Sequence, residues 1–585
     1  MRYTVNYMKY SVFTEEIPVR IEAEFSSYPP LMRTLLYRRG LHTRADAEKF
    51  LAPDYERDIR DPFLIHDMDR AVARIFVAIR AQEHIVVYGD YDCDGIPGSV
   101  VLHDFFKKIG YESRTHYIPH RHSEGYGLNI AAVEQFAKDN ATLLITVDCG
   151  ITDMKEVARA EELGINVIVT DHHLPLKDVD GKDMLPLAHA VLNSKKICDD
   201  YHDDMLCGAG VAWKLVQALL TRGREEKMID VPDGWEKWLL DMAGLSTIAD
   251  MVPLRKENRA LAHFGLTVLR KSKRLGLRAL LKRTRIAQEH LTEDDIAFMI
   301  APRINAASRM GVPLDAFRLL ATDDETEAET LAEALTKLND ERKLAVARIM
   351  KEVKKEIAER EIKSVIVIGN PAWRVGVLGI VANNMMEEYQ RPVFVWGREG
   401  AEHIKGSCRS DGSVSVVELM HAVNKGVFID AGGHEFSGGF SVSHEHIHLV
   451  EDALISAYAR VKKEKINDKE LIADAELLIK EVTWNTYETI ARLAPFGEGN
   501  SKPLFAFHEV VISGVRFFGK AREHVGLDLT DGERTVPAIS FFGAKNAALS
   551  SVSKGDTISF LAHMEKSMFK NRPELRLRIV DIKAH

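Results

Sequence analysis

The sequence has few cysteines and none of the arrangements in which cysteines act in pairs. Its five cysteines are scattered along 585 residues without a C-x-x-C pair, which is typical of free thiols in a reducing compartment. No apolar stretch approaches the roughly 18 to 20 residues of a membrane span. The N-terminal segment MRYTVNYMKYSVFTEEIPVR lacks the apolar core and the cleavage site of a signal peptide. We therefore expect a cytoplasmic protein without a membrane partner.

An overall excess of positive charge is also missing, although one basic segment stands out. The net charge is −9 at pH 7, which on its own argues weakly against a nucleic-acid partner. Residues 270–285, RKSKRLGLRALLKRTR, nevertheless carry eight basic side chains and no acidic one. Two interpretations stay open for this segment, a solvated helix face and a groove for a polyanion.

The chain does contain enough ordinary globular sequence for several domains. Hydrophobic residues make up 46% and charged residues 28% of a length that exceeds what one hydrophobic core accommodates. Strand-like apolar runs at 84–89, 142–150, 166–173 and 189–193 alternate with helical patterns, which predicts a parallel α/β sheet. Because ligands of such sheets bind beyond the carboxyl ends of the strands, the turns after the first three runs are expected to meet at one site.

Glycine and proline are absent from Leu314 to Ile368. Strong helix formers fill much of this stretch, so we expect one helix of about 38 residues, roughly 57 Å long, that connects two domains. A second α/β pattern follows, with strand-like segments at 364–370 and 391–397 and a glycine-rich stretch at 430–443. From about Asp474 onward, short alternating strands with turn signals predict a small β-barrel. The first seventy or so residues form a helical preamble whose role the sequence does not reveal.

Four polar clusters at the ends of successive elements carry the chemistry. They are Asp90, Asp92 and Asp94, then Asp148, then Asp171 with His172 and His173, and then Asp250. Carboxylates mixed with imidazoles are the ligands expected for Mg²⁺ or Mn²⁺, and thiolates are missing from the set. Any one cluster alone would more often be a solvated turn or a structural pair. Together they predict a site for two divalent ions, which can supply a hydroxide and clamp the oxygens of a phosphoryl group.

The motifs around these residues resemble those of a known superfamily. GDYDCDG (89–95), TVDCG (146–150), TDHH (170–173) and IADMVPL (248–254) look like the metal motifs of the DHH phosphoesterase superfamily. Seven further segments extend the resemblance to the single-strand-specific exonucleases of that superfamily over nearly the full length. These segments are YIPHRHSEGYGLN (117–129), LCGAGVAWKLVQAL (206–219), APRINAASRMG (301–311), WRVGVLGIVA (373–382), KGSCRS (405–410), GGHEFSGGF (432–440) and LAPFGEGNSKP (493–503).

The resemblance implies a multidomain α/β architecture. A helical preamble at 1–75 would precede a parallel-sheet DHH catalytic domain at 76–285. A helical connector at 286–361, which includes the long helix, would lead to a DHH-associated α/β domain at 362–462. An OB-fold β-barrel that binds nucleic acid would occupy 463–585.

The resemblance also implies an activity, metal-dependent hydrolysis of single-stranded DNA from 5′ to 3′ into mononucleotides, in DNA repair and recombination. The implied cofactors are two Mn²⁺ or Mg²⁺ ions. The implied metal ligands are Asp90, Asp92, Asp94, Asp148, His172 and Asp250. Of these, Asp90 is either an alternative ligand or a residue that contacts the ligands without binding the metal itself. His173 would lie close to the scissile phosphate and complete the catalytic set. Single-strand-binding protein and a helicase are partners by family analogy.

Substrate-binding residues are expected among the arginines of glycine- and proline-punctuated motifs, since a guanidinium group donates two hydrogen bonds to a phosphate. By the resemblance, the contacts to DNA phosphates, including the terminal 5′ group, are Arg121, Arg303, Asn305, Arg309, Ser407, Arg409 and His434. In the predicted barrel, aromatic and basic side chains suit the stacking of unpaired bases, although about half of the phenylalanines must be core. These are Phe505, Phe507, Phe517, Phe541 and Phe542, beside Lys520, Arg522 and Lys570.

Three positions depart from the superfamily pattern. Tyr88 stands where many members have a metal-binding histidine, which predicts that one metal site is weaker than the other. Pro97 replaces the usual threonine, and Arg374 and Val375 replace His-Pro after the motif tryptophan. These departures leave the presumed metal ligands intact and affect the positioning of the substrate.

Two other functions stay open. A DHH hydrolase of pyrophosphate, short oligonucleotides or cyclic dinucleotides would need only the two α/β domains, so the barrel and the basic segment favour a polymer. A non-catalytic DNA-binding scaffold would have lost metal motifs, and none is lost here.

Overall fold

The computed structural model describes residues 10–199, 201, 205–399, 402–424, 426–462, 471–568 and 572–584, so Lys570 lies outside the described residues. Two compact units divide the chain. The first contains the residues up to Ile59, Pro253–His263 and the residues from Asn467 onward, and the second contains Arg60–Val252 and Phe264–Ile466. None of the helices in the described ranges has the length and the apolar composition of a membrane span.

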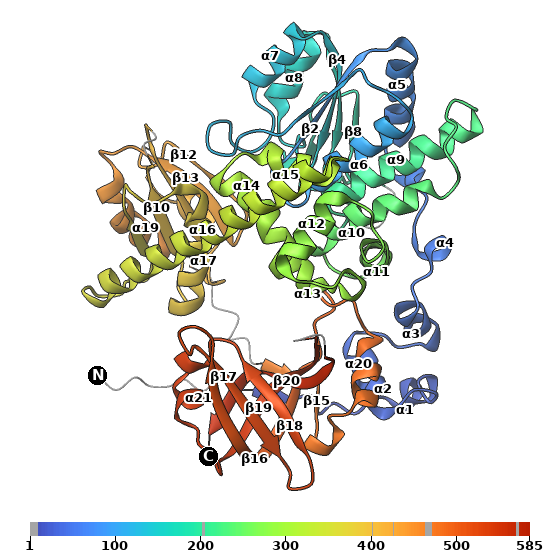
Figure 1. Ribbon diagram of the computed structural model, residues 1–585. Helices are drawn as coiled ribbons and strands as arrows, with labels where there is room; N and C mark the ends of the chain where they lie inside the picture. The colour runs from blue at the N-terminus through green and yellow to red at the C-terminus, as the bar shows by residue number, and fades with distance from the viewer. Residues whose placement is uncertain are drawn as a thin grey trace. The chain divides into compact units, whose positions relative to one another are not determined.

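The second unit begins with a five-stranded parallel sheet in the order β3-β2-β4-β5-β8 (Figure 1). Its strands are β2 (His84–Gly89), β3 (Arg114–Tyr117), β4 (Ala141–Val147), β5 (Asn166–Thr170) and β8 (Ala190–Leu192). One face is covered by α5 (Met68–Ala81), α6 (Gly95–Lys108) and α9 (Gly208–Glu225), the other by α7 (Ile130–Lys138) and α8 (Met154–Glu162). Because both faces are buried, the central strands are nearly continuous apolar runs, and the four predicted strands are confirmed.

A layer of helices leads from this sheet to the connector. It contains α10 (Leu240–Ala249), α12 (Leu275–Thr284), α13 (Glu293–Asp295), α14 (Ala301–Met310) and α15 (Pro313–Ala321), together with the end of α11 (Lys256–Leu269), whose residues up to His263 belong to the first unit. The predicted connector is one helix, α16 (Glu325–Ala358), whose 34 residues correspond to about 51 Å. Asp324 caps its N-terminus by accepting a hydrogen bond from the Glu327 amide. The first half of α16 packs on α12, α14 and α15, and the second half on the next domain (Figure 1), so the connecting role is confirmed.

That next domain contains the second predicted α/β pattern. Its sheet has the order β12-β13-β11-β10-β9, in which only β9 and β10 run parallel. The strands are β9 (Ile366–Gly369), β10 (Val393–Gly397), β11 (Ile404–Arg409), β12 (Asp430–Gly433) and β13 (Ser437–Val442). Helix α17 (Leu378–Tyr389) packs on one face, and α18 (Val416–His421) and α19 (Val450–Val461) pack on the other. The glycine-rich stretch at 430–443 forms the β12–β13 hairpin.

The first unit contains the predicted barrel. Its strands are β15 (Ala475–Glu476), β16 (Phe505–Phe518), β17 (His524–Thr530), β18 (Thr535–Ser540), β19 (Thr557–Ser567) and β20 (Glu574–Ala584). The order is β15-β16-β17-β18-β20-β19, and β16 also pairs with β19, which closes the sheet into a barrel. The prediction of a barrel is therefore confirmed.

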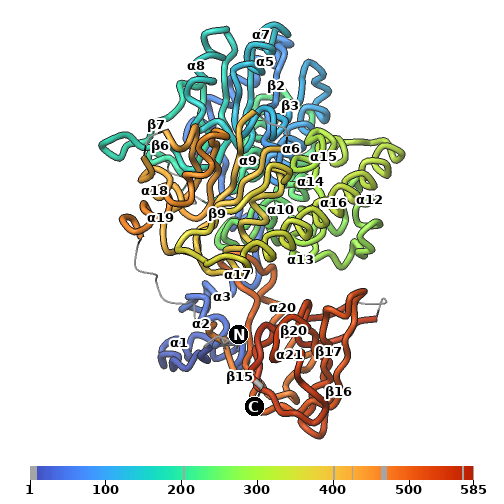
Figure 2. Tube along the Cα trace, turned by 90° about the vertical axis from the view of Figure 1, so that its left-hand side faces the viewer, coloured from blue at the N-terminus to red at the C-terminus, as the bar shows by residue number. Residues whose placement is uncertain are grey.

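The N-terminal helices belong to the same unit as the barrel. They are α1 (Val19–Glu24), α2 (Pro30–Arg38), α3 (Arg44–Leu51) and α4 (Tyr55–Asp58). Figure 2 shows α1 and α2 beside β15. Phe25, Leu35 and Leu36 are fully buried in one hydrophobic cluster with Phe505 and Phe507 of the barrel. The helical preamble thus completes the core of a barrel that begins more than four hundred residues later in the sequence.

Candidate metal centre

The acidic turn after β2 is held by backbone amides. The Asp94 carboxylate accepts hydrogen bonds from the amides of Gly208 (2.6 Å) and Ala209 (2.8 Å) at the start of α9, whose positive end favours a carboxylate. Asp92 accepts a hydrogen bond from the Asp94 amide at 2.8 Å. A Cβ atom on Gly95 would lie 2.5 Å from the carbonyl oxygen of Asp90, so only glycine fits there. The turn therefore presents its carboxylates at the carboxyl end of the strand.

Two further turns bring a carboxylate and two imidazoles to the same edge of the sheet. Asp148 follows β4 with a φ of +64°, a left-handed conformation that few residues other than glycine adopt. Asp171 follows β5, and its Oδ1 accepts hydrogen bonds from the amides of His172 (2.7 Å) and His173 (3.0 Å). The same oxygen lies 2.8 Å from Nδ1 of His173. Asp171 thus positions both histidines.

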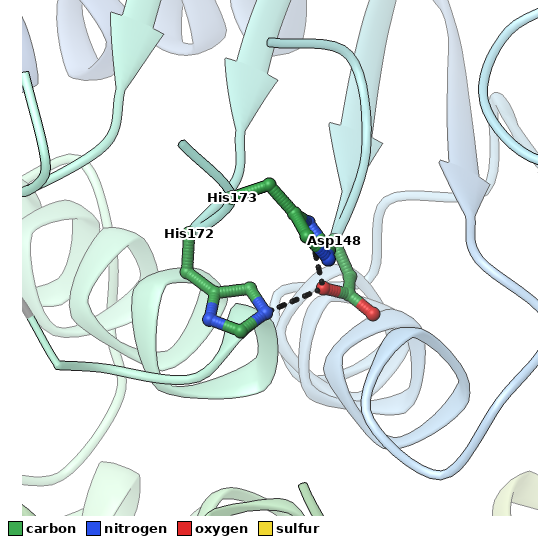
Figure 3. Close-up of side chains that lie close together, drawn as sticks. All are labelled: Asp148, His172 and His173. Carbon is green, nitrogen blue, oxygen red and sulfur yellow. Dashed lines mark ion pairs between the residues drawn. The ribbon is translucent and has the colours of Figure 1, made fainter. Parts of the chain in front are cut away.

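The predicted metal ligands converge on the Nε2 atom of His172. This atom lies 3.2 Å from Asp148 Oδ1, 3.5 Å from Asp94 Oδ2 and 3.7 Å from Asp250 Oδ2, at the end of α10. Figure 3 shows both histidines directed at the Asp148 carboxylate. Three overlapping groups have donor atoms close enough to hold a metal ion. They are Asp90, Asp92 and Asp148; Asp94, His172 and Asp250; and Asp148, His172 and His173.

Burial and mutual repulsion oppose ionisation of these carboxyl groups. Burial, followed by the charge of Asp92, raises the pKa of Asp94 to about 6. Burial and then Asp94 raise the pKa of Asp250 to about 8. Burial and neighbouring carboxylates also raise two further pKa values well above the ordinary value, those of Asp90 and Asp148. A divalent cation would remove this repulsion, because it would neutralise the carboxylates that now face one another.

The two histidines have opposite charge states. Burial lowers the pKa of His172 to about 3, so its imidazole is neutral, which is the form that binds metals. Burial alone would also lower the pKa of His173, but the hydrogen bond with Asp171 outweighs burial and raises it to about 9. Tyr126 Oη lies 3.0 Å from His173 Nδ1 and donates to the Asp148 carbonyl oxygen at 3.0 Å. His173 is therefore a cation at neutral pH.

The donor set fits a divalent cation. Within the described part of the chain, the buried Oδ1 atoms of Asp90 and Asp148 have no hydrogen-bond partner, which is costly unless a cation satisfies them. Carboxylate oxygens with imidazole nitrogen and without thiolate suit Mg²⁺ or Mn²⁺. Tyr88 does not take part, since its side chain is buried and its Oη donates to the carbonyl oxygen of Gly127 at 2.8 Å.

Several predicted phosphate-binding residues surround the acidic turn and the histidines. The guanidinium of Arg121 lies 4.8 Å from the ring centre of Tyr91 within the turn. Asn305 Oδ1 accepts a hydrogen bond from the Cys93 amide at 2.8 Å, so Asn305 also supports the turn. The His434 ring stacks 6.4 Å from the ring of His173. Ser407 and Arg409 lie on one face of β11, because side chains two residues apart in a strand point the same way. Their contacts to DNA stay predictions.

Arg303 and Arg309 on α14 are buried or nearly buried cations whose only hydrogen bonds in the described chain are to backbone carbonyls. The Nε atom of Arg303 has no partner among the described residues. On α16, Arg342 donates to Asn339 Oδ1 at 2.9 Å, while Arg342 Nε and Asn339 Nδ2 have no partner within the same ranges. Such a group of buried donors suits an anion, as a phosphate would supply.

Four residues of this site have roles that the sequence does not reveal. Asp171 was expected within one of the metal-binding clusters and Tyr126 lies in a motif of the superfamily, but their hydrogen bonds depend on turns that the sequence does not show. Asn339 and Arg342 lie three residues apart on the long helix, which places both on one face. No sequence pattern distinguished them from the many polar residues of that helix.

Part of the basic segment at 270–285 is engaged within the protein. The Arg274 side chain is 14% exposed and pairs with Asp104 (2.6 Å) and Asp241 (2.7 Å). Two more of its cations pair with α16, Lys282 with Glu329 (2.6 Å) and Arg283 with Glu333 (2.7 Å). These contacts give a structural role to three of the eight basic residues, and a groove for a polyanion stays open for the others.

The barrel aromatics divide between core and surface. Phe505 and Phe507 are fully buried, whereas Phe541 and Phe542 are exposed. The guanidinium groups of Arg576 and Arg578 lie 6.0 and 5.8 Å from the Phe541 ring centre. The exposed pair is therefore the part of the barrel that is suited to base stacking.

The departures from the superfamily pattern do not disturb the metal ligands. Pro97 is the third residue of α6, where helix amides have no intrahelical acceptor, so the missing donor costs little. Arg374 lies outside the acidic turn and pairs with Glu399 at 3.4 Å.

Family models match three parts of the chain. A model described as the DHH family, N-terminal domain, matches residues 84–243. A model of the DHHA1 domain matches residues 362–463, and a model of the RecJ OB domain matches residues 473–581.

Curated relatives and a solved structure agree with these models. The single-stranded-DNA-specific exonuclease RecJ of Bacillus subtilis is 33% identical over 94% of this chain and 68% of its own length. The Escherichia coli protein of the same name is 30% identical over 88% of this chain and 89% of its own length. The crystal structure of RecJ in complex with Mn²⁺ from Thermus thermophilus has a TM-score of 0.80 and 26% identity, covering 98% of this chain and 79% of that chain. The chain belongs to the RecJ family of single-stranded-DNA-specific exonucleases.

Proposed function

We propose that this chain degrades single-stranded DNA from 5′ to 3′ into mononucleotides, in DNA repair and recombination in the cytoplasm. The observation that carries the proposal is the convergence of six carboxylate and imidazole ligands, five after strand ends and Asp250 at the end of α10, in a chain similar to RecJ over most of its length. The barrel supports a polymeric substrate, because small substrates need only the two α/β domains. Single-strand-binding protein and a helicase are the partners that family analogy suggests.

Two Mn²⁺ or Mg²⁺ ions would be held by the residues that converge on His172 and by their neighbours, namely Asp90, Asp92, Asp94, Asp148, His172 and Asp250. When bound, such ions lower the pKa of a water molecule and stabilise the oxygens of a phosphoryl group. The structure of a Thermus relative with Mn²⁺ supports this choice of metal. The hydrogen bonds that backbone amides donate to Asp94 hold this ligand in place before a substrate arrives, and the left-handed backbone conformation of Asp148 does the same for Asp148.

The remaining residues orient the substrate. Asp171 keeps His173 protonated and fixed, so that its positive charge can oppose negative charge that develops on a phosphate oxygen. The phosphates of the strand, with the 5′-terminal group, would be held by Arg121, Arg303, Asn305, Arg309, Ser407, Arg409 and His434.

One assay separates this function from the alternatives. Protein with Mn²⁺ is incubated with 5′-labelled single strands, 3′-labelled single strands, a blunt duplex and pyrophosphate. We expect mononucleotides to appear early from the 5′ label alone. Activity confined to pyrophosphate would support the small-substrate hydrolase, and binding without hydrolysis would support a scaffold.

Two variants locate the activity. Asp148→Ala is expected to abolish hydrolysis while the fold stays intact, whereas Asp230→Ala, at an exposed position, keeps wild-type turnover. Arg409→Ala is expected to raise KM for DNA with little effect on Mn²⁺ binding. Near-normal turnover in Asp148→Ala would refute the metal assignment.

A further inference from the structure

The second unit contains a cavity of about 330 Å³ that is rich in cations. Four basic side chains line it, from α14, from the turn before α17 and from both sides of the β10–β11 connection. They are Arg309, Arg374, Arg398 and Lys405. Glu399 is the only carboxylate among the lining residues, and His120 and His122 complete the polar wall.

Two of these cations, Arg309 and Lys405, have no carboxylate partner among the described residues. Glu399 pairs with Arg374 at 3.4 Å and also accepts a hydrogen bond from the Val375 amide at 3.1 Å. Lys405 donates to the His122 carbonyl oxygen at 3.2 Å, and Arg309 donates to a carbonyl oxygen as well. Among the described residues, neither Lys405 nor Arg309 pairs with a carboxylate. Two cations without a carboxylate partner in the described chain favour an anionic ligand here.

The cavity adjoins the predicted phosphate-binding residues. Lys405, Ser407 and Arg409 alternate along one face of β11, and four residues of strand span about 13 Å. Arg309 lines the cavity and also interacts electrostatically with Arg121 and Asp92 of the candidate site. A ligand in the cavity would therefore lie beyond the phosphate that Ser407 and Arg409 are proposed to hold.

We infer that this cavity binds a polyphosphate group. Guanidinium and ammonium groups are the donors that suit phosphate oxygens. Only two aliphatic side chains, Met310 and Val375, line the wall. Four basic side chains around one cavity match several linked phosphates better than one phosphodiester. Arg374, which replaces the histidine of the superfamily motif, supplies one of these cations.

Two sources share this chemistry. One is the 5′ end of a strand that carries two or three phosphates, and this source depends on the proposed function. The other is a free polyphosphate, whose binding does not depend on it.

The test is calorimetric titration of metal-free protein in EDTA, where no hydrolysis occurs. The ligands are inorganic tripolyphosphate, inorganic orthophosphate, and a single-stranded 12-mer with either a 5′-triphosphate or a 5′-monophosphate. The test variant is Arg374→Gln/Lys405→Gln. The matched control is Lys351→Gln on an exposed turn of α16, and thermal unfolding checks that each variant is folded.

We expect wild type and Lys351→Gln to bind tripolyphosphate about tenfold or more tightly than orthophosphate, and the double variant to lose about tenfold. A 12-mer that binds more tightly with its 5′-triphosphate, in wild type but not in the double variant, identifies the strand end as the source. Equal binding of both 12-mers identifies free polyphosphate instead. Absence of tripolyphosphate binding, or equal binding by the double variant, overturns the inference even if the exonuclease activity is established.

Discussion

Asp148 and Asp171 are buried carboxylates beside the same histidines, yet their surroundings are opposite. Asp148 faces other carboxylates, and burial together with their repulsion holds its pKa well above the ordinary value. Burial acts on Asp171 in the same direction, but the hydrogen bond and charge of His173 outweigh it and lower the pKa. Asp148 is therefore suited to bind a metal cation, whereas Asp171 already pairs with the imidazole of His173. This difference separates the predicted effects of removing either charge.

Replacing Asp148 by Asn is expected to remove Mn²⁺ binding without destabilising the metal-free protein. The carboxylate repels four other aspartates in the absence of metal, so its loss leaves the midpoint of thermal unfolding in EDTA unchanged or higher. Wild type should gain about 3 kcal/mol at a Mn²⁺ concentration of about 100 Kd, and Asp148→Asn should gain almost none. Thermal melts with and without Mn²⁺ measure both effects. Full stabilisation of the variant by Mn²⁺ would contradict the ligand assignment.

Replacing Asp171 by Asn is expected to affect catalysis more than metal binding. The variant loses the anion that keeps His173 protonated and oriented, so kcat should fall by about 10- to 100-fold. KM for single-stranded DNA and the Kd for Mn²⁺ should change less, because the six proposed ligands remain. Steady-state kinetics and Mn²⁺ titration separate the two effects. A variant that loses Mn²⁺ binding as completely as Asp148→Asn would show that Asp171 supports the metal instead.

At the scale of elements, the sequence predicts best where burial dictates composition. β2, β4 and β5 are buried on both faces, so their apolar runs are continuous and visible. β3, with the sequence RTHY, pairs only with β2 at the sheet edge and carries no apolar run, so no pattern indicated it. The long helix is four residues shorter than predicted because residues at both ends of the predicted stretch lie outside it, with Asp324 as the N-terminal cap and Glu359 as the C-terminal cap.

The candidate site also contains residues that the sequence predicts and residues that it does not. Acids at the ends of parallel strands could be predicted to meet, because parallel topology places those ends at one edge. Asn339 and Arg342 could not be predicted, since only the packing of α16 on α14 brings them beside Arg303. The direction in which Tyr88 points could not be predicted either, and it depends on a hydrogen bond to a loop carbonyl.

A pair of histidines between α6, β3 and α15 is expected to make stability depend on pH. His103 Nδ1 lies 3.2 Å from His116 Nε2, and the His116 ring stacks 4.8 Å from the ring of Phe317. Burial lowers the pKa of His103 to about 4 and that of His116 to about 3. Below about pH 6.5 these two histidines bind protons in the unfolded chain but not in the folded chain, so the free energy of unfolding falls as the pH falls.

The measurement is urea unfolding at pH 7.5 and pH 5.0. We expect the double variant His103→Leu/His116→Phe to lose less free energy of unfolding across this range than wild type, by about 1 to 3 kcal/mol. An equal loss in both proteins would show that other groups carry the pH dependence.

At the scale of the whole molecule, the first unit is assembled from separated parts of the sequence. The N-terminal helices and the residues Pro253–His263 fold with the C-terminal barrel. Hydrophobic patterning predicts that α2 is amphipathic but does not say against what it packs. The cluster around Phe25, Leu35 and Phe505 gives the answer, because a barrel with a short first strand needs additional apolar side chains to cover its core.

This arrangement predicts that a substitution near the N-terminus loosens the C-terminal barrel. Leu35 is fully buried in the shared cluster, so Leu35→Ala should destabilise the first unit by about 2 to 5 kcal/mol. Val19→Ala, at an exposed position of the neighbouring helix, should have almost no effect. Hydrogen exchange measured on peptides from β16 to β19 should accelerate in Leu35→Ala, while Mn²⁺ binding by the second unit stays at the wild-type Kd. Loss of a buried leucine from a core that the N-terminal helices share with the barrel must weaken the packing of the barrel strands. Unchanged hydrogen exchange in these strands would therefore mean that the helices and the barrel do not share a core.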